Sequence, residues 1–381
     1  MGYLTYLVEE LGPRESATQQ ELAGAEYLAS QLEGFGYLVE LQPFTIKIVS
    51  AELSGLSIDG TGPQAPGVIP LISSPEGDAS GSVVAIGLAR EGDLPQEGLT
   101  GKIALVQRGL IPFQEKVDRA AEAGALAAVI YNNLPGNFRG VLSRPTAIPA
   151  VAISQRDGER IEELLEAGPV TASVSVKTIT LTSHNVVATK PGPETGSANK
   201  TVVLGGHYDT VPNVSGANDN SSGTAVFLAI AQELAQESLP FAVQFIGFGS
   251  EELGLRGSQH YIASLSEDEK DSIIAMFNFD ALGSGRRAGV LGDVALTNLA
   301  MEQANDLGIA VRIGGGLRGG GSDHQTFSSA GIPVLMFFAP DFSRIHTAAD
   351  TLEFINPSLL GDAAELALAV LRSPDFLTVL D

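Results

Sequence analysis

Residues 201–220 read TVVLGGHYDTVPNVSGANDN and contain the pattern on which the fold prediction rests. The first six residues form a short apolar run, which is typical of a buried strand. His207 and Asp209 follow that run directly, and a loop then leads to Asp219. The next stretch, TAVFLAIAQELAQ at 224–236, is long and apolar enough to predict a helix. A strand, a loop and a helix in this order are the repeating unit of an α/β domain.

The same alternation continues to the C-terminus. Apolar runs predict strands at 241–248, 273–279 and 332–338, and three- and four-residue periodicity predicts helices at 297–308 and 358–373. Strands that alternate with helices favour a sheet whose strands are mostly parallel. We therefore predict an α/β fold with a mixed, largely parallel central sheet flanked by helices.

Two other parts of the chain differ from this pattern. Residues 1–43 begin as two helices separated by a turn and continue into a strand near residue 37. Residues 44–180 consist of short alternating segments with many Gly and Pro, and one amphipathic helix is predicted near 115–125. We expect 44–180 to form a separate, β-rich module.

The composition limits the possible partners. The chain has 381 residues, of which 45 are acidic and 22 basic, so its formal net charge is −23 and nucleic acid or anionic lipid would repel it. Cysteine is absent, which excludes disulfides, thiolate nucleophiles and cysteine-ligated metals. No apolar run approaches the ~18 residues of a membrane helix. We expect neither a nucleic-acid partner nor a membrane partner.

Acidic and imidazole side chains gather at the ends of the predicted strands. Five loops supply the candidates: His207 and Asp209, Asp219, Glu251 and Glu252, Asp280, and His346. In open α/β sheets, ligands bind beyond the carboxyl ends of the strands. Several carboxylates in one place would repel one another and take up protons unless a cation joined them. The pattern therefore predicts a divalent metal site.

The ligand types indicate which metal. Imidazole and carboxylate without thiolate suit Zn²⁺ best, and Co²⁺ or Mn²⁺ fit the same geometry. Two imidazoles and three carboxylates, one of them shared, make a site for two ions. We therefore expect two Zn²⁺ ions as the cofactor, with Co²⁺ or Mn²⁺ as substitutes.

Five motifs resemble those of a known family: HYD at 207–209, GANDNSSG at 216–223, SEELGLRGS at 250–258, NFDALGS at 278–284 and RIHTAAD at 344–350. The family is that of the co-catalytic di-zinc aminopeptidases, which also includes glutamate carboxypeptidases, transferrin receptors and glutaminyl cyclases. The resemblance covers 181–381 and the helices of 1–43. It implies that these two segments form one zinc-exopeptidase-like domain.

The resemblance also implies which side chains bind metal. His207 and Asp280 are expected to bind one zinc, and Glu252 and His346 the other. Asp219 is expected to bridge the two ions.

Further roles follow from the same resemblance. Glu251 is expected to act as the general base, which takes a proton from the attacking water and delivers it to the departing amine. Asp209 is expected to accept the N–H on the other ring nitrogen of His207 and so hold its tautomer. The HTAAD spacing suggests the same role for Asp350 toward His346.

The middle module resembles the protease-associated domain, through GKIALVQRG at 101–109, FQEKVDRAAEAGALAAVIYNN at 113–133 and AIPAVAISQRDGERI at 147–161. This domain is often inserted into exported peptidases of the family, where it is described as shaping access to the active site. RGLIPF at 108–113 lacks the Cys of the usual signature. The resemblance suggests a secreted or extracellular protein and leaves a cytoplasmic location open.

Other polar residues are interpreted as structural: Asn218, Asn220, His184 and His260. Ser322, Asp323 and His324 are consecutive, which does not favour a serine-hydrolase triad, and His324 is expected to support the pocket. Many relatives carry Tyr before the final His ligand, whereas this chain has Ile345. Stabilisation of the oxyanion would then fall to the metals or to another donor.

These observations predict a metal-dependent aminopeptidase that acts on peptides with a free N-terminus, with apolar first residues expected. An acidic site suits a cationic α-amino group better than a C-terminal carboxylate. The main alternative is a carboxypeptidase of the glutamate-releasing type. It would need arginines near the substrate, for which the candidates are Arg286, Arg287, Arg312, Arg318 and Arg344. A glutaminyl cyclase and a non-catalytic binding protein on the same scaffold are further alternatives.

Overall fold

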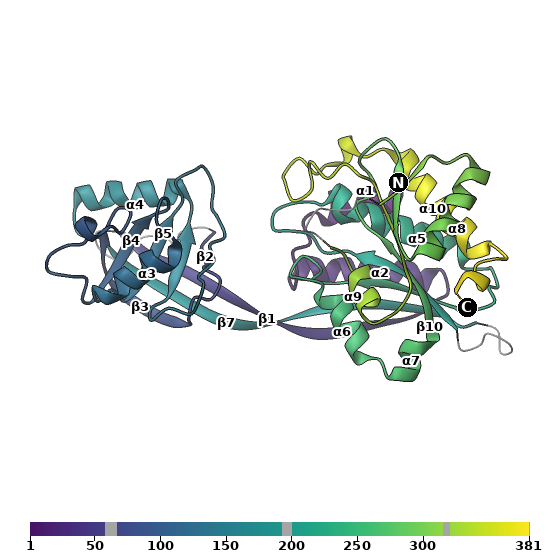
Figure 1. Ribbon diagram of the computed structural model, residues 1–381, viewed down its shortest axis with the longest axis horizontal. Helices are drawn as coiled ribbons and strands as arrows, with labels where there is room; N and C mark the ends of the chain where they lie inside the picture. Colours follow the sequence, from purple (N-terminus) through teal and green to yellow (C-terminus); the bar gives the residue numbers. More distant parts are fainter. Residues whose placement is uncertain (58–66, 193–199, 315–320, 381) are drawn as a thin grey trace. The chain divides into compact units, whose positions relative to one another are not determined.

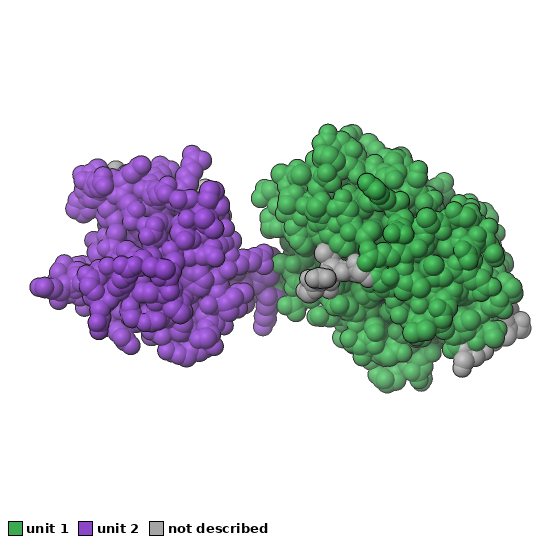
Figure 2. All heavy atoms as spheres, turned by 45° about the horizontal axis from the view of Figure 1, so that its top comes forward, with its two compact units in different colours: residues 1–46, 182–381 green, residues 47–181 purple. Residues whose placement is uncertain are grey.

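The computed structural model describes residues 1–57, 67–192, 200–314 and 321–380 (Figure 1). The chain divides into two compact units (Figure 2). Unit 1 consists of residues 1–46 and 182–381, and unit 2 consists of residues 47–181. No helix among the described residues is both long and apolar enough to cross a bilayer.

Unit 1 is built on a sheet whose described strands are β8 (Thr201–His207), β9 (Ala242–Phe248), β10 (Ile273–Phe279), β11 (Ala288–Gly292), β12 (Val311–Ile313) and β13 (Val334–Phe338). The sheet order is β12-β11-β13-β10-β8-β9, followed by β7 (Thr171–Lys190). Strands β13, β10, β8 and β9 are parallel, whereas β11 and β7 run antiparallel to β13 and β9. The predicted mixed, largely parallel sheet is confirmed.

Helices cover both faces of this sheet. Four pack into one core cluster: α2 (Gln19–Gly34), α5 (Gly223–Leu234), α8 (Val294–Leu307) and α10 (Pro357–Arg372). The opposite cluster includes Tyr261 of α6 (Arg256–Ser264) and Phe327 of α9 (His324–Ser329), while α7 (Glu267–Ser272) leads into β10. Phe277 belongs to the first cluster and Met276 to the second, because successive strand residues point to opposite faces. Burial on both faces explains why these strands are continuously apolar.

The N-terminal segment belongs to unit 1. It contains α1 (Gly2–Thr5), a π-helical turn η1 (Tyr6–Leu11) and α2. Leu4, Leu7 and Leu28 are fully buried in the same cluster as β8 and α5. Two short 3₁₀ turns, η4 (Leu352–Phe354) and η5 (Thr378–Leu380), flank α10.

Unit 2 has its own parallel strands, β3 (Gly77–Ala85), β4 (Lys102–Gln107), β5 (Ala127–Tyr131) and β6 (Ala150–Ile153). The short β2 (Ile69–Pro70) pairs with β6, and β7 pairs with β3. Helix α3 (Phe113–Glu122) packs on one face and α4 (Gln155–Ala167) on the other, and a 3₁₀ turn η2 (Glu91–Asp93) precedes β4. The strand β1 (Leu38–Ser57) and β7 contribute residues to both units.

Helix α4 was not predicted from the sequence, which indicated one helix in this module. Ser154 caps α4, since its Oγ accepts the Asp157 N–H at 3.1 Å. Gly158 lies in its first turns, and a Cβ there would be 2.2 Å from the Tyr131 side chain. Close packing on β5 therefore requires glycine at this position. Unit 2 is a mixed sheet, parallel from β3 to β6 and antiparallel where β7 and β2 pair with it, and it has a helix on each face.

Candidate metal centre

The candidate residues follow parallel strands that end at one edge of the unit 1 sheet. His207 is the last residue of β8, Glu251 and Glu252 follow β9, and Asp280 follows β10. Strand β8 lies between β9 and β10, and β13 lies beside β10. The loop after β13 carries His346. The strand order thus gathers these residues at one place, as the sequence predicted.

Three buried side chains form a first cluster. Nε2 of His207 is 3.1 Å from Oδ1 of Asp219 and 3.6 Å from Oδ1 of Asp280. One ligand atom from each of the three residues lies within 4.8 Å of the other two. A single ion can therefore be reached by one imidazole and two carboxylates.

Asp219 also belongs to a second cluster. Its other oxygen, Oδ2, is 3.0 Å from Nε2 of His346, and that nitrogen is 3.3 Å from Oε2 of Glu252. Each oxygen of Asp219 thus faces a different imidazole. The His346 side chain is 51% exposed and that of His207 only 1%, so the second cluster is the one open to solvent.

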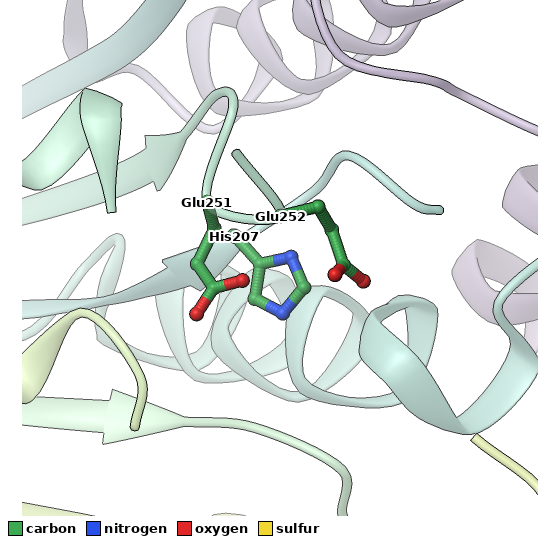
Figure 3. Close-up of side chains that lie close together, drawn as sticks. All are labelled: His207, Glu251 and Glu252. Atoms are coloured by element: carbon green, nitrogen blue, oxygen red, sulfur yellow. The ribbon is translucent and has the colours of Figure 1, made fainter. Parts of the chain in front are cut away.

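Glu251 lies beside these clusters. Figure 3 shows the carboxyl groups of Glu251 and Glu252 on either side of the His207 ring, and ligand atoms of these three residues lie within 4.8 Å of one another. Burial raises the pKa of Glu251 well above its usual value, and this rise outweighs the lowering effect of His207. Nearby Asp323 and Asp280 raise this pKa further. Glu251 is thus a carboxyl group suited to accept a proton.

Asp209 connects the two glutamates to His207. Its Oδ1 lies 3.3 Å from Nδ1 of His207, the ring nitrogen that faces away from Asp219. The same carboxylate accepts the backbone N–H groups of Glu251 at 3.1 Å and Glu252 at 3.3 Å. The expected contact with His207 is present. The hydrogen bonds from the backbone of Glu251 and Glu252 were not predicted from the sequence.

The comparison with known proteins agrees with this geometry. The profile of peptidase family M28 matches residues 185–371, and the PA domain profile matches residues 73–161. Aminopeptidase YwaD of Bacillus subtilis (strain 168) is 33% identical over 388 residues, which cover 96% of this chain and 82% of that protein. The chain belongs to peptidase family M28. It carries an inserted PA domain.

Other relatives of this chain are also named as aminopeptidases. Probable leucine aminopeptidase 2 of Aspergillus fumigatus is 35% identical over 285 residues, which cover 72% of this chain and about half, 55%, of that relative. Among solved structures, BSAP, a zinc aminopeptidase from Bacillus subtilis, has a TM-score of 0.76 at 29% identity and covers 97% of this chain and 92% of its own. The aminopeptidase from Aneurinibacillus sp. strain AM-1 has a TM-score of 0.64 at 34% identity, with 96% and 92% covered.

The side chains of this M28 site fit zinc. All ligand atoms are imidazole nitrogens and carboxylate oxygens, which zinc accepts. Oε1 of Glu252 is buried and has no hydrogen-bond partner among the described residues. Buried polar atoms are normally satisfied, so this orphaned oxygen marks a place where a cation belongs.

The charges of the site lead to the same conclusion. Burial alone would raise the pKa of Asp219, but hydrogen bonds from His207 and His346 lower it overall. Asp219 and Glu252 in turn raise the pKa of His346 to about 10. Without metal, the charge of the Asp219 carboxylate is thus stabilised by protons on the two imidazoles. Divalent cations would supply the same compensation without those protons.

Asp350 holds the Asp219 turn and not His346. Its Oδ1 accepts the Asn218 N–H at 2.7 Å, and its Oδ2 accepts the Asp219 N–H at 3.1 Å. Asp219 lies on a short π-helical turn, η3 (Ala217–Ser222), which precedes α5. The prediction that Asp350 orients His346 was wrong, because its carboxylate instead accepts the backbone N–H groups of Asn218 and Asp219. The spacing HTAAD does not reveal which backbone groups lie beside the carboxylate.

The two asparagines beside Asp219 connect the ligand loops. Nδ2 of Asn220 donates to the carbonyls of His207 at 3.2 Å and Phe279 at 2.8 Å. Its Oδ1 accepts the Gly223 N–H at 2.9 Å, at the start of α5. Oδ1 of Asn218 accepts the Gly283 N–H at 2.6 Å. Both asparagines have structural roles, as predicted.

The remaining candidates lie outside the clusters described above. The hydroxyl of Ser322 accepts a hydrogen bond from Nδ2 of Asn278 at 2.8 Å, and His324 lines a cavity of about 630 Å³. His260 stacks on Phe44 with ring centroids 5.1 Å apart. Arg318 and most of the glycine-rich stretch 314–321 lie outside the described residues.

Proposed function

We propose that this M28 aminopeptidase, which depends on zinc, hydrolyses the first peptide bond of its substrates with two zinc ions and Glu251 as general base. His207 and Asp280 would hold one ion, Glu252 and His346 the other, and Asp219 would bridge them. The observation that carries this proposal is the position of Asp219, whose two oxygens face His207 and His346 at 3.1 and 3.0 Å. When bound, zinc supplies a Lewis acid that polarises a carbonyl and makes water more acidic.

The chain's own residues would manage the protons. Glu251 would take the proton of the attacking water and deliver it to the departing amine, a role for which its raised pKa suits it. Asp209 would keep the Nδ1–H of His207 directed toward itself, so that Nε2 is free to bind metal. Because Asp209 also binds the backbone of both glutamates, it would fix the base and one ligand together.

The substrates we propose are peptides with a free N-terminus. The α-amino group is a cation, and the buried carboxylates around Glu251 and Asp280 favour a cation at this edge of the sheet. Arg344, one of the arginines that carboxylate recognition would require, instead stacks on Phe354 at 3.9 Å and pairs with Asp341 at 3.6 Å. These contacts favour an aminopeptidase over a carboxypeptidase.

The test is a substrate panel. Aminoacyl-p-nitroanilides, their N-acetylated forms and peptides with a C-terminal glutamate are each assayed with a chelator and after zinc or cobalt is added back. We expect chelator-sensitive hydrolysis of the free-amino substrates alone. Cleavage only of the acetylated or C-terminal substrates would instead favour the carboxypeptidase. Zinc titration of the metal-free chain measures whether one or two ions bind.

A further inference from the structure

We propose that the N-terminal segment 12–21 positions the metal centre, with Ser16 orienting Asp209 and Glu21 fixing the turn that carries Glu251 and Glu252. The proposal rests on the function proposed above. It concerns residues that lie outside the stretch matched by the M28 profile, which begins at residue 185. Neither side chain touches a candidate ligand, so both would act as positioning residues.

Ser16 acts on Asp209. Its hydroxyl donates to Oδ2 of Asp209 at 2.6 Å, and both residues are buried. Asp209 has three other partners: the ring of His207 and the backbone N–H groups of Glu251 and Glu252. Ser16 therefore supplies the one side-chain hydroxyl that this carboxylate binds among the described residues. Removal of that hydroxyl would take away one of the two hydrogen bonds to Oδ2 of Asp209 and so loosen the orientation of the carboxylate.

Glu21 acts on the turn after β9. Its Oε1 accepts the backbone N–H of Ser250 at 2.8 Å, the Ser250 hydroxyl at 3.1 Å and the Ser183 hydroxyl at 2.8 Å. Its Oε2 accepts the Ala17 N–H at 2.7 Å. Glu21 is only 1% exposed, so these protein groups replace water as its hydrogen-bond partners. One of them, Ser250, directly precedes Glu251. A buried carboxylate is costly unless it is hydrogen-bonded in this way.

The backbone of that turn needs such support. Ser250 has φ +53°, a left-handed conformation that residues other than glycine adopt only when the surroundings hold them. Gly249 precedes it, and a Cβ there would lie 2.5 Å from the Ser183 Oγ and 3.0 Å from Oε1 of Glu21. The absence of a side chain at 249 thus lets the carboxylate reach the turn. Glu251 follows immediately, so the direction of the base depends on this contact.

Arg14 anchors the same segment to two other ligand-bearing loops. It is fully buried, and its guanidinium donates to the Tyr208 carbonyl at 2.8 Å and to the Ser221 hydroxyl at 2.7 Å. Its backbone N–H donates to Oγ1 of Thr210 at 2.9 Å. Tyr208 and Thr210 flank Asp209, and Ser221 follows Asp219 in η3. One ten-residue segment therefore contacts three of the loops that form the site.

The test compares the full chain with four variants, with Co²⁺ as the metal probe. Ser16→Ala removes the donor to Asp209, and Ser16→Thr restores a hydroxyl. Glu21→Gln turns an amide N–H₂ toward N–H groups that need acceptors. Glu33→Gln makes the same side-chain substitution at an exposed position of α2 and serves as the control. The measurements are Co²⁺ affinity by chelator competition, the visible spectrum of the bound Co²⁺, and kcat and KM on an aminoacyl-p-nitroanilide.

We expect Ser16→Ala and Glu21→Gln to weaken Co²⁺ binding or lower kcat by ~10–100-fold. The Co²⁺ spectrum should change while KM does not, and Ser16→Thr and Glu33→Gln should resemble the unmodified chain. Folded Ser16→Ala and Glu21→Gln proteins with unchanged affinity, spectrum and kcat would overturn the proposal. If Glu21→Gln fails to fold, the pair of Ser16 variants decides. If the unmodified chain binds Co²⁺ but cleaves no peptide, the proposed function fails, and the affinity and spectrum still test the segment.

Discussion

Units 1 and 2 both contain parallel strands with helices on both faces, yet their strand ends carry different chemistry. The strand ends of unit 1 carry buried carboxylates and imidazoles. In unit 2, Arg108 follows β4 and Asn132 follows β5, and the two side chains bond to each other at 2.9 Å. Leu110 and Leu134 of the same loops are 86% and 61% exposed. The groups able to hold a metal among the described residues all lie in unit 1. Architecture alone therefore does not specify a site.

The two units also bury charge differently. In unit 1, buried carboxylates lie beside imidazoles or accept several N–H groups, as Asp219 and Asp209 do. In unit 2, Lys116 is buried on α3, and its ammonium donates to the Leu88 carbonyl at 2.6 Å. Unit 1 thus concentrates charge where a cation can bind, whereas in unit 2 a backbone carbonyl satisfies the Lys116 ammonium.

The largest effect is expected for Glu251→Gln. The amide cannot accept the proton of the attacking water, so kcat should fall by ~10²–10⁴-fold. Zinc content should stay near that of the unmodified chain, because Glu251 is not one of the five proposed ligands. The measurements are kcat and the number of zinc ions per chain, both on the purified protein. Arg108→Gln, at a strand end of unit 2, is the control and should change neither. Loss of zinc from Glu251→Gln would show that the roles of Glu251 and Glu252 are reversed.

Asp350→Asn should have the next largest effect. The amide oxygen can still accept the N–H of Asn218 or of Asp219, but the amide nitrogen is a donor and cannot accept the second N–H. The Asp219 turn therefore loses one hydrogen bond. We expect zinc affinity or activity to fall by ~10–100-fold. Chelator competition measures the affinity. Asp306→Asn, an exposed change on α8, is the matched control. Equal affinities in the two variants would mean that Asp219 is held without Asp350.

Gly158→Ala should break unit 2 packing without touching the site. A Cβ would overlap the Tyr131 side chain at 2.2 Å, and overpacking of this kind costs about 1–3 kcal/mol of unfolding free energy. Gly361→Ala is the matched helix control, because a Cβ at 361 meets nothing within 4 Å and should stabilise α10 by roughly 0.5–1 kcal/mol. Denaturant unfolding compares the variants. Equal unfolding free energies for Gly158→Ala and Gly361→Ala would contradict the packing of α4 on β5. The kcat per folded molecule should be unchanged in both variants.

The smallest effect is a pH dependence that arises from Lys116. Burial lowers the pKa of the Lys116 ammonium to about 8. Asp93 and Glu115 raise this pKa, whereas Arg90 and Arg119 lower it further. In the unfolded chain Lys116 keeps the ordinary pKa near 10.5 and so binds more protons than in the folded chain between pH 8 and 10.5. The contribution of Lys116 to the unfolding free energy therefore rises with pH in that window. Lys116→Met should flatten this rise in unfolding free energy. An identical slope in both proteins would mean that the buried ammonium titrates normally.

Much of the architecture could be predicted because burial leaves a direct signal in the sequence. Strands β8, β9, β10 and β13 are apolar on both faces and were predicted as strands. Helix α4 was missed although the sequence carries its signal: Ser154 is an N-cap, and Ile161, Leu164 and Leu165 recur at helical spacing and pack on the sheet.

The sequence by itself determined which chemical groups are available and in what order they follow the strands. Residue type and position after an apolar run suffice for that, as for His207 and Asp280. Only the tertiary structure decided which residues hold the candidate ligands in place. Asp350 binds the Asp219 turn, and Ser16 and Glu21 reach loops that lie 193 and 229 residues away in the chain. Hydrogen bonds depend on distances of a few ångströms between atoms, which packing sets and which spacing along the chain does not encode.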